Sequence, residues 1–375
     1  MLSTYLNYQL ITRDMTTSIG RVEKQPMVAR ESAYFQQNIG KVTSIEDFVK
    51  DDRLFKFAMK AFGLSDMDYA KAFMVKAMKE GVADPDSFAN KLTDKRYAEF
   101  VATFNFASRD ERTTNYVEAA DGVVDRYTLA AVAAGVEIDN PQLEKINNDY
   151  LAKIGKVTSI DQFLANDDLY VYAMKAHGLE EYISNKTFMR EILEGGVADP
   201  DSLANRQKNE AFAEFATSLN FAAYGEKTTT YNKVIEDTVA KYTRQTLEED
   251  AGVQNEGVRL ALYFERKMNA GGISSAYQIL ADPALSQVVR TALGIPESMA
   301  TADVDRQAAM IESKIDFDEL SEPDGLKKFM QRFTAMWDIQ NTSNTAVASV
   351  SVLFSQPVSF GLSTDVMLTL SKLQR

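Results

Sequence analysis

The sequence predicts an all-α protein made of three tandem helical repeat units of about 115 residues, and three observations carry this prediction. Residues 39–64 return as residues 154–179, always 115 positions later, and 16 of these 26 positions are identical. Apolar residues recur at the spacing of one helix face. Capping residues and glycines mark helix ends at matching places in the copies. We therefore expect helical units that share apolar surface, as stacked repeats do.

The first two units are predicted at residues 1–111 and 112–226. The 115-residue offset also places residues 81–90 on residues 196–205, where nine of the ten residues are the same. The offset therefore extends through most of both units.

A third unit, which has diverged further, is predicted at residues 227–340. Its residues 274–295 follow residues 158–179 at an offset of 116, and residues 327–337 take the place of the aromatic helix near residue 215. We expect this unit to match the others only in part.

Helix signals recur within the units. In residues 94–107 an apolar set repeats at i, i+3, i+4 and i+7, so one helix face should be buried. Ser44 with Asp47, and Ser159 with Gln162, resemble capping boxes. Glycines close the apolar helices where a left-handed residue is needed. The apolar set is Tyr97, Phe100, Val101 and Phe104, its second copy is Phe212, Phe215, Ala216 and Leu219, and the glycines are Gly63, Gly178 and Gly294.

The tail, residues 341–375, differs from the repeats. Residues 341–345 are typical of a turn-rich linker, and residues 348–360 alternate apolar and polar residues, which is compatible with a small β-hairpin. A terminal amphipathic helix is expected over residues 362–373. Its apolar stripe is Leu362, Val366, Leu370 and Leu373, and the start of the chain has a comparable stripe at Tyr8, Ile11, Met15, Ile19 and Val22.

Both terminal stripes predict contacts with protein partners, or self-association, because apolar stripes left in water are unfavourable. Charge and composition argue against other kinds of partner. The chain has 375 residues, a net charge of −13 and no cysteine. The negative charge disfavours nucleic acid as a partner. No apolar run is long enough for membrane insertion, and disulfides and thiolate metal sites are excluded.

Two repeated acidic loops are the first candidate metal-binding sites. Asp84 and Asp86, and again Asp199 and Asp201, could hold calcium, but the rest of a twelve-residue calcium loop is missing. We expect Asp84 and Asp199 to be helix N-caps, with the following prolines at the first helical position.

His177 is the only histidine, and the equivalent position in the first unit is Phe62. A position that accepts phenylalanine is expected to be a packing site. The sequence at Gly225–Thr228 resembles the end of a phosphate-binding loop, but it lacks the earlier glycine and the preceding strand. Trp337 and the phenylalanine stripes are expected to form core. We therefore predict no catalytic, cofactor-binding or metal-binding residues, and a protein that is not an enzyme.

Several long blocks, among them residues 44–64, 84–106, 255–267, 276–296 and 332–338, resemble a domain-of-unknown-function family encoded in flagellar gene clusters of alphaproteobacteria. The resemblance extends over about residues 2–338. It implies association with the flagellum and no reaction or cofactor.

Three classes of function remain open from the sequence. The first is a structural or assembly protein of the bacterial flagellum, placed there or outside the cell by the flagellar type III route. The second is a cytoplasmic export chaperone, scaffold or regulator that works through protein contacts. The third, an enzyme acting on the cell wall, needs two carboxylates across a cleft, and no motif places them so.

Overall fold

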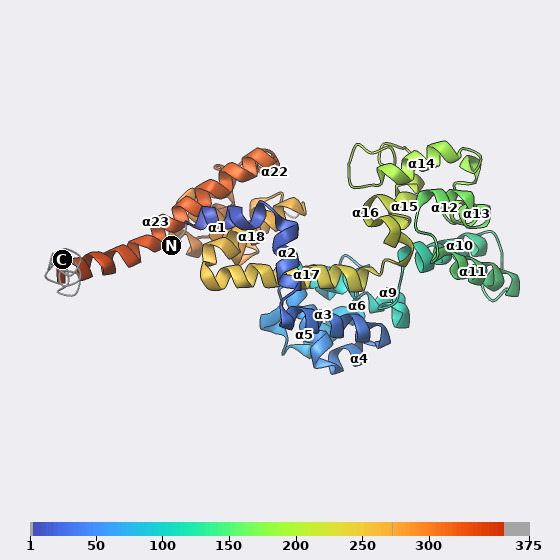
Figure 1. Ribbon diagram of the computed structural model, residues 1–375, viewed down its shortest axis with the longest axis horizontal. Helices are drawn as coiled ribbons and strands as arrows, with labels where there is room; N and C mark the ends of the chain where they lie inside the picture. The colour runs from blue at the N-terminus through green and yellow to red at the C-terminus, as the bar shows by residue number, and fades with distance from the viewer. Residues whose placement is uncertain (1–2, 272, 356–375) are drawn as a thin grey trace, which may run out of the picture. The chain divides into compact units, whose positions relative to one another are not determined.

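The structure is a computed structural model that describes residues 3–271 and 273–355 (Figure 1). Every regular element in these ranges is a helix, so the predicted all-α class is confirmed. The chain forms two compact units. We call Ile19–Thr246 the central unit, and the residues up to Ser18 together with those from Leu247 onward the terminal unit.

The central unit contains two blocks whose helices follow one another in the same order. Block 1 consists of α3 (Pro26–Asn38), α4 (Ile45–Lys50), α5 (Asp52–Ala61), α6 (Lys71–Glu80), α7 (Phe88–Lys91), α8 (Arg96–Thr103) and α9 (Phe106–Arg109). Block 2 consists of α11 (Pro141–Ile154), α12 (Ile160–Ala165), α13 (Asp167–Ala176), α14 (Lys186–Gly195), α15 (Ala211–Ser218) and α16 (Phe221–Tyr224).

Block 3 lies in the terminal unit and repeats this order with changes near its end. It consists of α18 (Glu256–Asn269), α19 (Ala276–Leu280), α20 (Pro283–Leu293), α21 (Val304–Glu312), α22 (Phe317–Ser321) and the long helix α23 (Pro323–Ser355). The helices that precede each block are α1 (Thr4–Thr12) with α2 (Met15–Glu23), α10 (Val123–Ala133) and α17 (Lys233–Gln254). A π-helical turn, Glu118–Gly122, leads into α10.

The predicted helix starts and stops are confirmed. The side chains of Ser44 and Ser159 accept hydrogen bonds from the backbone N–H groups of Asp47 and Gln162, and Ser275 in block 3 forms a complete capping box. Gly63, Gly178 and Gly294 have φ values of 68°, 66° and 64°. Glycine suits these positions because a side chain is strained in the left-handed region.

The predicted aromatic faces form the cores of the blocks. Phe100 and Phe104 are fully buried and pack on Phe48, and Phe215 packs on Phe163 in the same way. The helix expected over residues 94–107 is interrupted, because Phe104 and Asn105 leave the helical backbone and α9 begins at Phe106.

A helix outside each block completes its core, and for blocks 1 and 3 this helix comes from a distant part of the chain. We call α1, α10 and α17 the slot helices, and the groove that each one fills a slot. α10 fills the slot of block 2, where the Tyr127 and Tyr172 rings stack with centroids 4.1 Å apart. The start of α17 fills the slot of block 1, where Tyr242 stacks on Phe57 at 3.9 Å.

Block 3 is completed by α1, from the opposite end of the sequence. Its Tyr8 belongs to the apolar core formed by α18 and α20, and α1 packs along α18 and α23. The three slot helices, together with the π-helical turn that leads into α10, bury equivalent positions that lie 115 residues apart. The buried positions are Thr4, Ala119 and Val234, and then Tyr8, Val123 and Thr238.

The spatial units therefore divide the chain at other places than the sequence repeat does. The unit boundaries lie after Ser18 and Thr246, within or beside slot helices, and not near residues 111 and 226. The boundaries predicted at 111/112, 226/227 and 340/341 stay predictions about the sequence repeat.

The prediction for the start of the tail is wrong. Residues 341–355 continue α23 as helix, so they are neither a linker nor a strand. Extending a helix that is already formed costs far less than starting one, and here this outweighs the β-propensity of the serine and valine residues. The remainder of the predicted hairpin, residues 356–360, and the predicted helix over 362–373 lie outside the described residues.

The packing of the block cores predicts the cost of two substitutions. Phe100→Ala and Phe215→Ala should each lower the free energy of unfolding by about 3–5 kcal/mol, because both rings are fully buried. Leu129→Ala is the control, since 70% of that side chain is exposed, and it should change stability by less than about 0.5 kcal/mol. Chemical denaturation measures all three. Equal effects for Phe100→Ala and Leu129→Ala would contradict the packing described here.

Candidate functional site

The predicted N-terminal interaction stripe faces the interior of the protein. Tyr8 is 8% exposed, and Ile11 and Met15 are half-buried against the core of the terminal unit. Ile19 lies in α2 and is half-buried. Tyr8 and Ile11 of α1 and Met15 of α2 thus pack on the core of their own chain, and a role of this stripe in binding a partner stays a prediction. Leu362, Val366, Leu370 and Leu373 lie outside the described residues.

Hydrogen bonds fix α1 to the C-terminal helix α23. The Thr4 backbone N–H donates to Asp338 Oδ2 at 3.1 Å, and the Thr4 hydroxyl also donates to this carboxylate. Gln331 Nε2 donates to Tyr5 Oη at 2.8 Å. Both contacts connect residues more than 320 positions apart. The first and last described helices of the chain therefore pair side by side.

A third helix joins this pair. Asn255 Nδ2 donates to Thr4 Oγ1 at 2.8 Å, while its Oδ1 accepts the Gly257 N–H and caps α18. α23 approaches α18 so closely that a Cβ at Gly257 would lie 2.5 Å from the Trp337 ring. Thr4 is fully buried, and its bonds to Asp338 and Asn255 satisfy its polar atoms. Trp337 is thus a packing residue, as expected.

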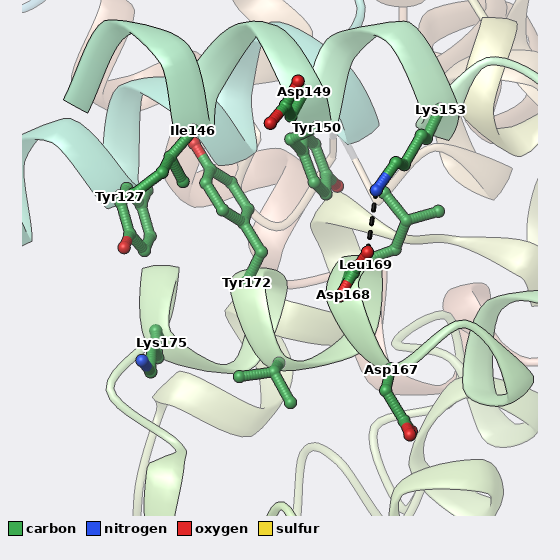
Figure 2. Close-up of a pocket in the computed structure, with 11 residues that line it drawn as sticks. Tyr127, Ile146, Asp149, Tyr150, Lys153, Asp167, Asp168, Leu169, Tyr172 and Lys175 are labelled. Atoms are coloured by element: carbon green, nitrogen blue, oxygen red, sulfur yellow. Dashed lines mark hydrogen bonds and ion pairs between the residues drawn. The ribbon is translucent and has the colours of Figure 1, made fainter. Parts of the chain in front are cut away.

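In block 2 a hollow of ≈ 470 Å³ lies between α10, α11 and α13. Tyr172 stands between Tyr127 and Tyr150 in a three-ring stack, with centroid distances of 4.1 and 4.3 Å (Figure 2). Charged side chains surround the stack, and Lys153 Nζ contacts Asp168 Oδ2 at 2.7 Å. The hollow combines an aromatic wall with a charged rim.

Block 1 has an equivalent hollow of ≈ 380 Å³. Phe57 stands between Phe35 and Tyr242, at 4.5 and 3.9 Å, so the three-ring stack is repeated. Lys60 lies in the hollow of block 1 at the position that Lys175 has in block 2. The other charges differ, because block 1 pairs Arg53 with Glu31 at 2.6 Å. The shared rings therefore serve the common packing, while the rims have diverged.

Four ionisable groups that line these hollows have shifted pKa values. Burial raises the pKa of Tyr172 and of Tyr150, so both phenols stay neutral. The hydrogen bond to Asp168 raises the pKa of Lys153. The hydrogen bond from Arg53 lowers the pKa of Glu31. Each of these groups keeps its ordinary charge more firmly than it would in water.

His177 is a packing residue, as the comparison with Phe62 predicted. It is 7% exposed, its Nδ1 lies 2.8 Å from the Ala173 carbonyl oxygen, and its Nε2 lies 3.1 Å from Ser218 Oγ. Burial lowers the pKa of His177 to about 4. The imidazole is therefore neutral at physiological pH and both ring nitrogens are engaged.

The repeated acidic loops form turns and not helix N-caps, so that expectation is wrong. Asp84 Oδ1 accepts the Asp86 N–H at 2.8 Å, and α7 starts only at Phe88 with Ser87 as its N-cap. Asn90 Nδ2 donates to the carbonyls of Val82 and Asp84. The Asn90 amide thus closes the loop. The helix expectation is wrong because an Asp-Pro pair can start a turn as readily as a helix.

The second loop repeats these contacts through Asp199 and Asn205. Throughout residues 3–271 and 273–355, no group of three or more acidic, histidine or cysteine side chains could hold a metal ion. In the same ranges, no helix is both long and apolar enough to cross a bilayer. Gly225–Thr230 is a 3₁₀ helix in which Thr228 Oγ1 donates to the Gly225 carbonyl.

Sequence reasoning missed the three-ring stacks and the exchange of slot helices. A signal for the stacks was present, because aromatic residues recur at an offset of 115 at 35 and 150, at 57 and 172, and at 127 and 242. No local signal says which block Tyr127 or Tyr242 contacts.

These features define the class: an all-α protein of internal repeats whose blocks are completed by exchanged helices. The chain belongs to the family described as protein of unknown function, DUF1217, whose profile matches residues 61–175 and again residues 176–326. The second match begins 115 residues after the first, so the family unit is present twice. No curated protein matches the chain.

The chain is also similar to a solved structure. This is the X-ray crystal structure of protein AGR_C_984 from Agrobacterium tumefaciens, which is 32% identical. The similarity covers 91% of this chain and 97% of that one, with a TM-score of 0.51.

The neutral, buried His177 predicts a pH dependence of stability. Its folded pKa of about 4 lies below the ordinary value of 6.5, so only the unfolded chain takes up this proton as the pH falls from 6.5 to 4. Stability from this group is complete above pH 6.5 and is lost over that interval. The difference corresponds to about 3 kcal/mol.

His177→Phe should abolish this loss, because the variant has no group to protonate and Phe62 shows that the ring fits. Denaturation at pH 7 and pH 4 measures the difference. The account fails if the variant loses as much stability on acidification as the parent chain.

The exchange of slot helices predicts a specific energetic coupling. In a double-mutant cycle, Phe57→Ala and Tyr242→Ala should couple by about 1 kcal/mol, as stacked aromatic pairs do. The matched control combines Tyr242→Ala with Tyr172→Ala, the equivalent of Phe57 in block 2, and should show no coupling. Coupling of Tyr242 to Tyr172 in place of Phe57 would mean that α17 contacts block 2, and it would contradict the contact with block 1 described here.

Proposed function

We propose that the protein is a non-enzymatic structural or assembly protein of the bacterial flagellum that acts through contacts with other proteins. The resemblance to a family encoded in alphaproteobacterial flagellar gene clusters supports the flagellar part of this proposal. The pairing of α1 with α23 supports the structural part, and it is the observation on which we rely most.

Axial proteins of flagella commonly pair an N-terminal with a C-terminal helix. In this chain, Thr4 and Tyr5 of α1 bind Asp338 and Gln331 of α23. α1 and the part of α23 near Asp338 thus lie side by side. A protein that is built into a larger assembly through these two helices benefits from this arrangement, since one partner can contact both.

α23 offers a surface that extends beyond its own block. The helix has 33 residues. Among its residues up to Asn341, whose side chains the structure describes, Thr334 is the last fully buried one and Trp337 the last that packs on the core of the terminal unit. In Figure 1 the end of α23 runs away from α1 and α18. An extended helix of this kind is suited to pair with a helix of another protein.

The non-enzymatic character is supported by the state of the ionisable groups. His177 is neutral and bonded within the core, and burial raises the pKa of Tyr150 and Tyr172, so these two phenols stay neutral. A cytoplasmic export chaperone, scaffold or regulator is the second candidate. The net charge of −13 favours it, because an acidic helical surface can bind basic partners.

Location distinguishes the two candidates. The full chain should be followed in cells, in medium and in purified flagella, in strains with and without a working flagellar export gate. A structural protein on the export route should reach the flagellar or medium fraction only when the gate works. Equal amounts inside both strains, with none outside, would favour the cytoplasmic partner and overturn the proposal.

The protruding end of α23 predicts the effect of a truncation. A chain that ends at Gln340 should keep its cooperative unfolding, because it retains Leu326, Met330 and Phe333, the buried apolar residues that the structure describes in α23, but it should associate less with flagellar structures and reduce motility. Swimming assays and fractionation measure the effect. Full motility and unchanged fractionation of a normally abundant truncated protein would make the end of α23 dispensable.

A further inference from the structure

α1 is a short helix whose contacts lie in the terminal unit. It has nine residues, and a helix of this length is unstable alone in water. Its stability therefore comes from the slot of block 3, where Tyr8 enters the core and Thr4 binds Asp338 and Asn255. Arg13 and Asp14 connect it to α2, which crosses from the terminal to the central unit.

The connection between α1 and α2 is a turn with its own local bonds. Asp14 Oδ1 accepts the Thr17 N–H at 2.9 Å, so Asp14 starts α2 independently of what α1 does. A hydrogen bond from Ser18 Oγ to the Ile11 carbonyl, at 3.0 Å, crosses the turn. The turn can therefore act as a hinge without unfolding α2.

The slots do not depend on how their helices are connected to them. α10 directly precedes block 2, whereas α17 follows block 2 and fills block 1, and α1 is separated from its partner Asp338 by 334 positions. α1 and α17, and α10 with the π-helical turn before it, bury the same two equivalent positions. A slot therefore recognises the face of a helix, whatever chain segment carries it.

We infer that the slot of block 3 is a self-association site, in which α1 of one copy fills the slot of a second copy of this chain. The helix from the second copy makes the same contacts with Asp338, Asn255 and the core. The native contacts are conserved in the exchange, which is why swapping of an identical element is a low-cost route to assemblies. Each copy donates one α1 and accepts another.

Concentration decides between the closed and the exchanged form. Within one chain, α1 meets its slot at an effective concentration on the order of millimolar for a short connection. Exchange therefore becomes populated when the chain is itself crowded to that level. The inference goes beyond the proposed function and does not depend on the flagellum, so localisation results do not bear on it.

The absence of cysteine permits a direct test with full-length chains. A Thr4→Cys chain and an Asp338→Cys chain each carry a single thiol, at two side chains that touch in the slot. The two chains are mixed at about millimolar concentration and then oxidised. Exchange predicts a covalent dimer that contains one chain of each kind.

Two controls define the result. A mixture of Leu129→Cys with Asp338→Cys measures random collision, because Leu129 is exposed on α10. The double variant Thr4→Cys/Asp338→Cys, oxidised at high dilution, should form a disulfide within one chain and so verify the geometry. Several-fold more mixed dimer than in the Leu129→Cys control supports the inference.

An independent measurement uses the unmodified chain. Light and isotope-labelled chains, mixed at about millimolar concentration and examined by native mass spectrometry, should give mixed oligomers. Tyr8→Asp should reduce them, because a charge in the apolar slot opposes insertion of α1 from either copy. If only monomers are found at that concentration and mixed disulfides stay at the control level, α1 serves its own chain alone and the inference is wrong.

Discussion

The structure depends on one constraint: no block closes its own core. In block 1 the Phe57 ring is covered on one side by Phe35 of the block and on the other by Tyr242, which arrives 185 positions later. In block 3 the core is completed by Tyr8, from the far end of the sequence. Without their slot helices these faces would be exposed to water, at a cost of about 1.5–3 kcal/mol for each large apolar side chain. Block 2 meets the same requirement with the adjacent helix α10.

This constraint separates the protein from ordinary stacked repeats, in which each unit contacts only its neighbours. Block 1 acquires its slot helix after block 2 has been synthesised, and block 3 uses a helix that precedes both other blocks in the sequence. Such non-local contacts slow folding more than they reduce stability, because loop-closure entropy grows only slowly with length. The contact between α1 and α23 joins residues 334 positions apart. Polar groups also specify this contact, because the buried Thr4 bonds to Asp338 and Asn255.

Most of the local structure follows from the sequence, because it has local causes. Serine caps, left-handed glycines and the spacing around Phe100 and Phe215 indicated the helices and their buried faces. The sequence indicates the apolar stripe at Tyr8 but not the block on which it packs. The offset of 115 residues shows that the three slot helices are equivalent, but it does not show which block each helix contacts. Residues 341–355 were misread because α23 propagates through residues of high β-propensity. Asp84 was misread because Asp-Pro starts both turns and helices.

The proposed role follows from the same geometry, in which the two ends of the sequence are joined by α1 and α23. The central claim is that, within one chain, block 1 is completed by α17 and block 3 by α1. Nuclear Overhauser spectroscopy on a chain with selectively labelled phenylalanine and tyrosine rings tests it most directly. The account predicts cross-peaks from the Tyr242 ring to the Phe57 ring and none to Tyr172. Cross-peaks between Tyr242 and Tyr172, with none to Phe57, would contradict it.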